Sequence, residues 1–340
     1  MPEDAQIRIA VVQAAPVFLN RAATVEKACG LMAEAAKAGA KLVVFPEAFV
    51  PGYPFWAWAV PPKENRLLSH LYATLLDQSV TVPDAATDAL CQAARETGAY
   101  VVMGINERNA EASNASLYNT LIYIDPSGKL FGKHRKLVPT AAERLIWAAG
   151  DGDTFDAYDT ALGKIGGLIC WENYMPLARY AMYAWGVQIL LTPTWDEGEP
   201  WLSTLRHIAK EGRVYVASSS IAMRQDQIPD EWEFKAAYYA SAPEWFKKGD
   251  SAIVNPDGHF IAGPVREREQ ILYADLDPRE MRGPKWKLDV AGHYSRPDVF
   301  QLTVFKGARR AITVSQEAGP ASSTQLLDEP GVPENGQLQR

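Results

Sequence analysis

Short runs of apolar, often β-branched residues alternate along the chain with longer stretches that have helical periodicity. Several of the short runs are apolar at nearly every position, which is typical of strands covered on one or both faces. Eight runs predict strands, at residues 7–13, 41–47, 100–105, 120–125, 165–170, 187–193, 214–220 and 251–256. This alternation predicts an α/β fold.

A helix is predicted between the first two strands. Val25, Ala28, Met32 and Ala35 follow one another at intervals of three, four and three, so they share one helical face, and Gly39 suits the C-terminal end. Three further helices are predicted, at 84–97, 175–186 and 200–212.

The turn sequence "DPSG" at 125–128 separates two strand-like stretches and predicts a hairpin, so we expect a mixed sheet. Two segments, 53–75 and 225–247, are crowded with aromatic residues and are expected to be insertions on the α/β frame. Such aromatic residues can line a pocket, form a subunit contact or pack within the chain, and the sequence leaves these alternatives open.

Composition sets the domain organisation and excludes some classes of function. The 340 residues are 47% hydrophobic and 22% charged, which is ordinary for a globular protein. After Phe305 the sequence becomes rich in Pro, Gly, Ser, Gln and Glu, so we expect one domain over 1–305 and a flexible C-terminal tail over 306–340. The net charge of -7 argues against a nucleic-acid partner.

No apolar stretch approaches the roughly 18 residues of a membrane span, and the N-terminal residues lack the apolar segment of a signal peptide. We therefore expect a cytoplasmic protein with no membrane partner. The three cysteines are widely spaced and form no CxxC pair, so neither a disulfide framework nor a zinc site is expected.

Cys170 ends an apolar strand-like run, and "WENYMPL" follows it at once. A thiol at this point lies at the carboxyl end of a strand, where α/β folds build their sites, and the N–H groups of the next turn favour the thiolate. Taken alone, a cysteine after an apolar run is more often a buried core residue.

Glu47 and Lys136 also follow strand-like runs. Glu47 could exchange protons if burial raised its pKa, although a surface glutamate opening a loop is the plain alternative. Lys136 lies in "GKHRKLVP", where a solvated basic edge strand would explain most of the charges. Beside a thiol its ammonium would favour the thiolate and stabilise an anionic intermediate. His134 could serve as the base of a Cys–His pair, but a surface imidazole is expected.

Three stretches that carry these residues, "FPEAFVPGYP", "HRKLVPTAAERLIWAAGDG" and "GGLICWENYMPLAR", resemble the motifs of the nitrilase superfamily of carbon–nitrogen hydrolases. The resemblance covers most of residues 6–305 and implies a four-layer α-β-β-α sandwich. No GxGxxG follows a predicted strand, so a Rossmann fold is disfavoured.

The resemblance implies a role for four residues. Glu47 corresponds to the general base, Lys136 to the cation that stabilises the intermediate, Cys170 to the nucleophile, and Glu143 to a second glutamate that positions substrate and water. It implies no cofactor and no metal. It also implies a homo-oligomer built from dimers that pair through the helices around Cys170, with spirals or filaments in some members.

The "CWE" at 170–172 and the "NYMPL" after it resemble the branch that hydrolyses nitriles, which implies a small nitrile as substrate and a carboxylate and ammonia as products. Amidase and carbamoylase remain alternatives within the superfamily. Aromatic residues after strands at the same end are candidates for lining the pocket or for a subunit contact. These are Tyr53, Phe55, Trp56, Trp58, Trp171 and Trp195, of which Tyr53, Trp56, Trp171 and Trp195 are the predicted substrate-binding residues.

Two hypotheses from other classes stay open. The chain could be an inactive scaffold that uses the sandwich for assembly, although such a protein has no need of all three catalytic residue types. A papain-like thiol hydrolase would need a histidine downstream of the nucleophile, and only His207, His259 and His293 are available.

Overall fold

The structure is a computed structural model that describes residues 6–308. These residues belong to one compact unit. The predicted flexible tail lies outside the described residues except for its first three. Within the described part, no helix is long and apolar enough to cross a membrane.

The first sheet has six strands and is mixed, as the sequence predicts. Across the sheet the order is β13 (Gln270–Leu276), β1 (Ile7–Gln13), β2 (Leu42–Val44), β3 (Tyr100–Arg108), β4 (Leu117–Ile124) and β5 (Leu130–Arg135). The three strands β1, β2 and β3 run parallel, and the other pairings are antiparallel. The predicted hairpin joins β4 to β5 through a turn closed by Gly128 N donating to Asp125 O at 2.9 Å.

The second sheet has seven strands. The order is β10 (Ala222–Arg224), β11 (Trp245–Val254), β9 (Tyr215–Ser218), β8 (Ile189–Leu191), β7 (Gly163–Gly167) and β6 (Ala157–Thr160), while β12 (Phe260–Arg266) pairs with β11. Here β7, β8 and β9 are parallel, so their carboxyl ends lie at one edge of the sheet.

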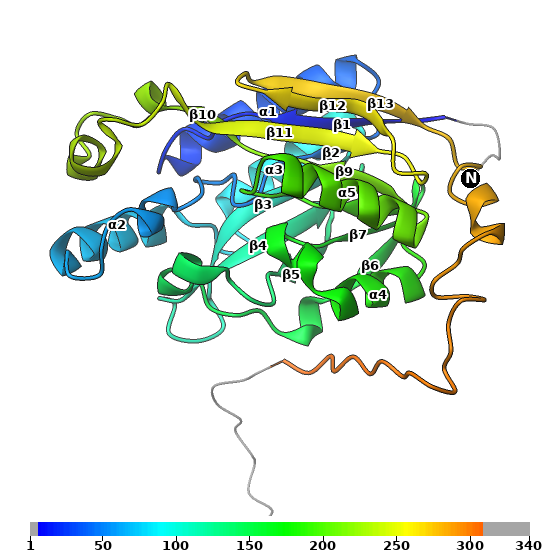
Figure 1. The fold of residues 1–340 in the computed structure, drawn as a ribbon. Coiled ribbons are helices and arrows are strands. Elements are labelled where there is room, and N and C mark those ends of the chain that lie inside the picture. Colours follow the sequence, from blue (N-terminus) through cyan, green and yellow to red (C-terminus); the bar gives the residue numbers. More distant parts are fainter. Residues whose placement is uncertain (1–5, 309–340) are drawn as a thin grey trace, which may run out of the picture. The chain divides into compact units, whose positions relative to one another are not determined.

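The two sheets face each other and helices cover their outer faces (Figure 1), which confirms the predicted four-layer sandwich. Residues of β1, β2 and β4 pack against residues of β7, β8 and β9 in one buried cluster between the sheets. Helices α1 (Arg21–Lys37) and α3 (Ala85–Thr97) cover the first sheet, and α4 (Pro176–Ala184) and α5 (Glu199–Gly212) cover the second. The predicted apolar face of α1 is buried against the first sheet.

Some elements escape prediction for identifiable reasons. β6 has no strongly apolar run, and β12 contains Gly263 and Pro264 with mostly exposed side chains, so neither has the pattern of a covered strand. Helix α2 (Asn65–Gln78) buries only Leu71 and Leu75, and it lies largely within the predicted insertion at 53–75, where no helix is predicted.

The aromatic residues of the two insertions pack mainly against each other within the chain. Phe18, Phe55 and Phe234 form a ring cluster with centroids 5.2–6.0 Å apart, and Tyr239 and Phe246 extend it. The insertions therefore share one apolar core that borders the edge where the catalytic candidates lie.

Candidate active site

Cys170 lies in a tight turn after β7. It opens the 3-10 turn Cys170–Tyr174 (η4), and α4 begins only at Pro176. Its backbone has φ +51°, an uncommon value for a residue with a side chain, and its N–H donates to Pro193 O at 2.8 Å. The side chain of Asn173 donates to Leu168 O and Cys170 O, at 2.8 and 2.9 Å. The thiol is thus presented on a strained turn that several hydrogen bonds hold.

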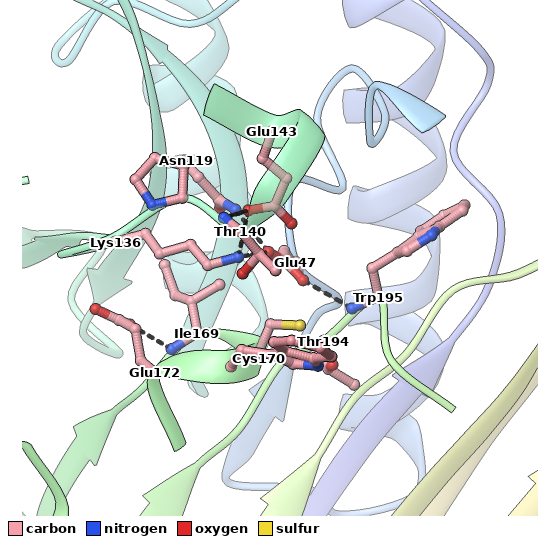
Figure 2. A network of polar contacts seen from close by, with 12 residues as sticks. Glu47, Asn119, Lys136, Thr140, Glu143, Ile169, Cys170, Glu172, Thr194 and Trp195 are labelled. Carbon is pink, nitrogen blue, oxygen red and sulfur yellow. Dashed lines mark hydrogen bonds and ion pairs between the residues drawn. The ribbon is translucent and has the colours of Figure 1, made fainter. Parts of the chain in front are cut away.

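Glu47 follows β2 on the other sheet and is completely buried. Its Oε1 accepts from Lys136 Nζ at 2.8 Å and Asn119 Nδ2 at 2.6 Å, while Oε2 accepts from Trp195 N at 2.7 Å (Figure 2). Gly104 on β3 makes room for this turn, because a Cβ there would lie 2.1 Å from Pro46 O. The carboxylate is therefore fixed by donors from both sheets.

Lys136 follows β5 and is also buried, at 1% exposure. Its Nζ donates to Glu47 as above and to Glu143 Oε2 at 2.7 Å, so one ammonium bridges two carboxylates. Glu143 lies in the 3-10 turn Ala141–Leu145, where Thr140 N donates to Oε2 and Tyr53 OH to Oε1, each at 2.7 Å. The structure brings together Glu47, Lys136, Glu143 and, beside them, Cys170 (Figure 2).

The charges of this cluster are strongly coupled. Burial raises the pKa of the Cys170 thiol to about 12, with Glu47 adding to the effect and Lys136 opposing it. Burial also raises the pKa of Glu47, although Lys136 opposes this too. For Lys136 itself burial opposes the charge, but Glu47, Cys170 and Glu143 outweigh it and raise its pKa. Burial and the nearby carboxylates therefore favour the neutral thiol over the thiolate, and Lys136 opposes them.

A cavity of about 270 Å³ opens onto Cys170 and Glu143. Its other lining residues are Tyr53, Trp58, Thr140, Trp171, Trp195, Asp196, Glu197, Phe246 and Lys247. Three of the predicted substrate-binding residues, Tyr53, Trp171 and Trp195, therefore face the cavity. Trp56 does not, because it is completely buried in the core that the two insertions share.

Several residues of the site carry no motif that sequence reasoning could find. Asn119 lies on β4 and bonds Glu47, and its only signal is a polar residue in a mostly apolar strand. Lys247 lines the cavity with only 3% exposure, and its Nζ donates to Glu197 Oε2 at 2.9 Å. Burial lowers the pKa of Lys247. In the sequence it is simply one of two adjacent lysines.

His134 corrects another expectation, because it is buried rather than on the surface. Its Nε2 lies 3.0 Å from Glu172 Oε2, and the ring is absent from the lining of the cavity. The predicted solvated basic edge is wrong as well: Lys133 and Arg135 both pair with the buried Glu107, at 2.7 Å. A buried acid thus explains this part of the basic stretch.

The three histidines downstream of Cys170 are exposed, and none lines the cavity, which leaves a papain-like pair without its base. Among residues 6–308, no group of three or more His, Cys, Asp and Glu side chains could hold a metal ion. The side chains gathered at the site are a thiol, several carboxylates and two buried ammonium groups.

Comparison with known proteins gives the family. The model of the carbon–nitrogen hydrolase family matches residues 8–284. The chain belongs to the carbon–nitrogen hydrolase family. This confirms the resemblance that the three motifs carry.

Relatives among the carbon–nitrogen hydrolases lie on the nitrilase branch. A nitrilase of Bradyrhizobium diazoefficiens is 43% identical over 90% of this chain and 94% of its own. An aliphatic nitrilase of Sinorhizobium fredii is 42% identical over 90% and 98%. A bifunctional nitrilase/nitrile hydratase of Nicotiana tabacum is 40% identical over 94% and 91%.

Solved structures of carbon–nitrogen hydrolases share the fold. A Saccharomyces cerevisiae member of branch 10 of the nitrilase superfamily matches with a TM-score of 0.66 at 22% identity, covering 86% of this chain and 98% of that one. An amidase from Nesterenkonia matches with a TM-score of 0.62 at 20% identity, covering 83% and 94%. At these identities the likeness concerns the fold alone.

Proposed function

We propose that this protein is a nitrilase that converts an organic nitrile and two water molecules to a carboxylic acid and ammonia, with Cys170 as the nucleophile. The observation that carries the proposal is the buried contact of Lys136 with Glu47 and Glu143 beside the Cys170 thiol, next to one cavity. The nitrilases that are about 40% identical over most of the chain support the same reaction.

The first half of the reaction uses Glu47 as a proton shuttle. Because burial raises the pKa of the thiol, Glu47 takes its proton as the sulfur attacks the nitrile carbon. The same carboxyl group then delivers that proton to the nitrile nitrogen, and the product is a thioimidate. Burial favours this exchange, since it raises the pKa of Glu47 toward the range in which a carboxylate serves as a base.

The second half needs two water molecules. The first adds to the thioimidate and forms a tetrahedral intermediate, which expels ammonia and leaves a thioester. The second, activated by Glu47, hydrolyses the thioester and releases the acid and the free thiol. Lys136, fixed between two carboxylates, stabilises the negative charge that develops in these steps.

Glu143 is assigned the positioning of substrate and water. It lines the cavity, and its carboxylate is held from three sides by Lys136, Thr140 N and Tyr53 OH. Tyr53, Trp171 and Trp195 are assigned to the walls of the substrate site. If the tetrahedral intermediate expelled the thiol in place of ammonia, an amide would leave, which is the activity that the name of the Nicotiana relative includes.

A panel of aliphatic and aromatic nitriles, assayed for ammonia and for acid, tests the proposal. Ammonia and acid should form in equal amounts from at least one nitrile. Turnover of the corresponding amides with no release from any nitrile would favour an amidase, since the Nesterenkonia enzyme shares the fold.

Assembly and location belong to the same proposal. Exposed apolar residues next to the Cys170 turn, Trp171 at 50% and Leu177 at 67% exposure, support a homo-oligomer that pairs through α4. Sedimentation would test it. A cytoplasmic location is proposed as well, and cell fractionation would test that.

A further inference from the structure

Glu172 is a buried carboxylate to which the proposed reaction assigns no step. It is 1% exposed, accepts hydrogen bonds from two backbone N–H groups and contacts the imidazole of His134. Leu137 N donates to Oε1 and Ile169 N to Oε2, both at 2.6 Å, and His134 Nε2 lies 3.0 Å from Oε2. Figure 2 shows the bond from Ile169 to Glu172 beside the turn that carries Cys170.

The two backbone donors belong to two different arms of the site. Leu137 directly follows Lys136, on the segment that leaves β5 of the first sheet. Ile169 directly precedes Cys170, on the segment that leaves β7 of the second sheet. One carboxylate therefore joins the backbone beside the cation to the backbone beside the nucleophile, across the boundary between the two sheets.

The nucleophile's turn needs such support. Cys170 holds φ +51°, a conformation that is unfavourable for a residue with a side chain and persists only when its surroundings impose it. Hydrogen bonds to an ionised acceptor are about twice as strong as neutral ones, so both N–H groups are bound tightly by a carboxylate.

We propose that Glu172 is a positioning residue, a clamp that keeps the Cys170 thiol and the Lys136 ammonium aligned with Glu47. This inference rests on the proposed function, and it adds a residue that acts through two others without touching the substrate. A displacement of about 1 Å in either arm is expected to slow the reaction about 100-fold.

The substitution Glu172→Gln isolates the clamp. Glutamine has nearly the same shape but offers one carbonyl oxygen and one NH2 group, so it cannot accept from Leu137 N and Ile169 N at once. One of the two arms therefore loses its partner. His134→Leu is the matched control, because it removes the imidazole that contacts Glu172 and leaves both backbone bonds in place.

Two measurements distinguish a clamp from a merely structural carboxylate. The first is kcat and KM with a nitrile that the wild type hydrolyses. The second is the rate at which iodoacetamide alkylates Cys170, followed by peptide mass and divided by the rates for Cys29 and Cys91 in the same molecules. These two cysteines lie outside the site and serve as internal references.

For Glu172→Gln we expect kcat to fall about 100-fold with KM within about threefold, and the relative alkylation of Cys170 to fall at least tenfold. For His134→Leu we expect both quantities to stay within about threefold of the wild type, even if its melting temperature falls. Glu172→Asp keeps the charge but is one methylene shorter, and it carries the same test if the glutamine variant does not fold.

Wild-type values in the Glu172 variants, or an alkylation ratio that is unchanged or higher, would overturn the clamp while leaving the proposed function intact. A parallel loss of kcat in His134→Leu would overturn it too, because that variant keeps both arms bound. If the wild type hydrolyses no nitrile and iodoacetamide alkylates its Cys170 no faster than its Cys29, the proposed function is overturned, and the clamp with it.

Discussion

Replacement of Lys136 by Met removes the one cation that two buried carboxylates share. Methionine keeps much of the apolar stem but leaves Glu47 and Glu143 without the partner that lies 2.8 and 2.7 Å away. Breaking a buried ion pair by removing one partner costs about 3–5 kcal/mol of folding free energy. At about 2–4 °C per kcal/mol for a large domain, the melting temperature should fall by roughly 10 °C.

The loss of stability should depend on pH in a defined direction. Burial already raises the pKa of Glu47 in the folded protein, and without Lys136 the raise becomes larger. A carboxyl whose folded-state pKa exceeds its unfolded value is stabilising below the unfolded pKa, and this contribution is lost as pH rises through the folded pKa. The variant should therefore lie closer to the wild type at about pH 5 than at about pH 8.

Thermal unfolding at these two pH values, combined with steady-state kinetics, checks both effects. Loss of the charge that stabilises the intermediate should lower kcat about 100- to 1,000-fold. The double variant Lys136→Met with Glu143→Gln should recover part of the melting temperature, because it removes one unpaired acid, but none of the activity. The reasoning is refuted if Lys136→Met keeps its activity within tenfold, or if its destabilisation is the same at both pH values.

The remaining predictions concern the nucleophile, the cavity and the core. Cys170→Ala should abolish turnover, and residual ammonia release above background would contradict this prediction. Its melting temperature should stay at or above that of the wild type, because the substitution removes no charged hydrogen-bonded group. Lys247→Met should change KM and the order in which polar and hydrocarbon nitriles are preferred, because Lys247 lines the cavity and contacts Glu197. We expect kcat to stay within about tenfold of the wild type. An unchanged order of preference would count against a role of Lys247 in recognition. Trp56→Ala should destabilise the fold by about 3–5 kcal/mol, because Trp56 is a core residue. Trp58→Phe should alter KM at unchanged stability, because Trp58 faces the cavity. Chemical denaturation and kinetics on both variants would show whether these two roles are instead exchanged.

Much of the sandwich could be predicted because its central strands are covered on both faces. Such strands leave nearly continuous apolar runs, and the helices against them show one apolar face, as in Val25, Ala28 and Met32. The missed strands β6, β10 and β13 lie at the edges of the two sheets, and β12 pairs along the margin of the second, where Gly263 and Pro264 are tolerated. Patterning of hydrophobic residues is weak at such positions.

The residues of the candidate site likewise fall into some that the sequence locates and others that it does not. Glu47, Lys136 and Cys170 each follow a strand and lie in recognisable motifs, so the sequence locates them. Asn119 bonds Glu47, which is 72 residues away, and Lys247 bonds Glu197, which is 50 residues away, and no local pattern encodes such contacts. The pKa of Cys170 depends on burial beside two acids, which is a property of the assembled fold and not of a local motif.

The two halves of the proposed reaction centre stand on different sheets. Glu47, Asn119 and Lys136 come from the first sheet, while Cys170 and Trp195 come from the second. The apolar layer between the sheets therefore acts as a spacer that sets the gap between base and sulfur. A change of even one methylene in that layer, such as Ile189→Val, is therefore expected to be felt at the gap between Glu47 and Cys170.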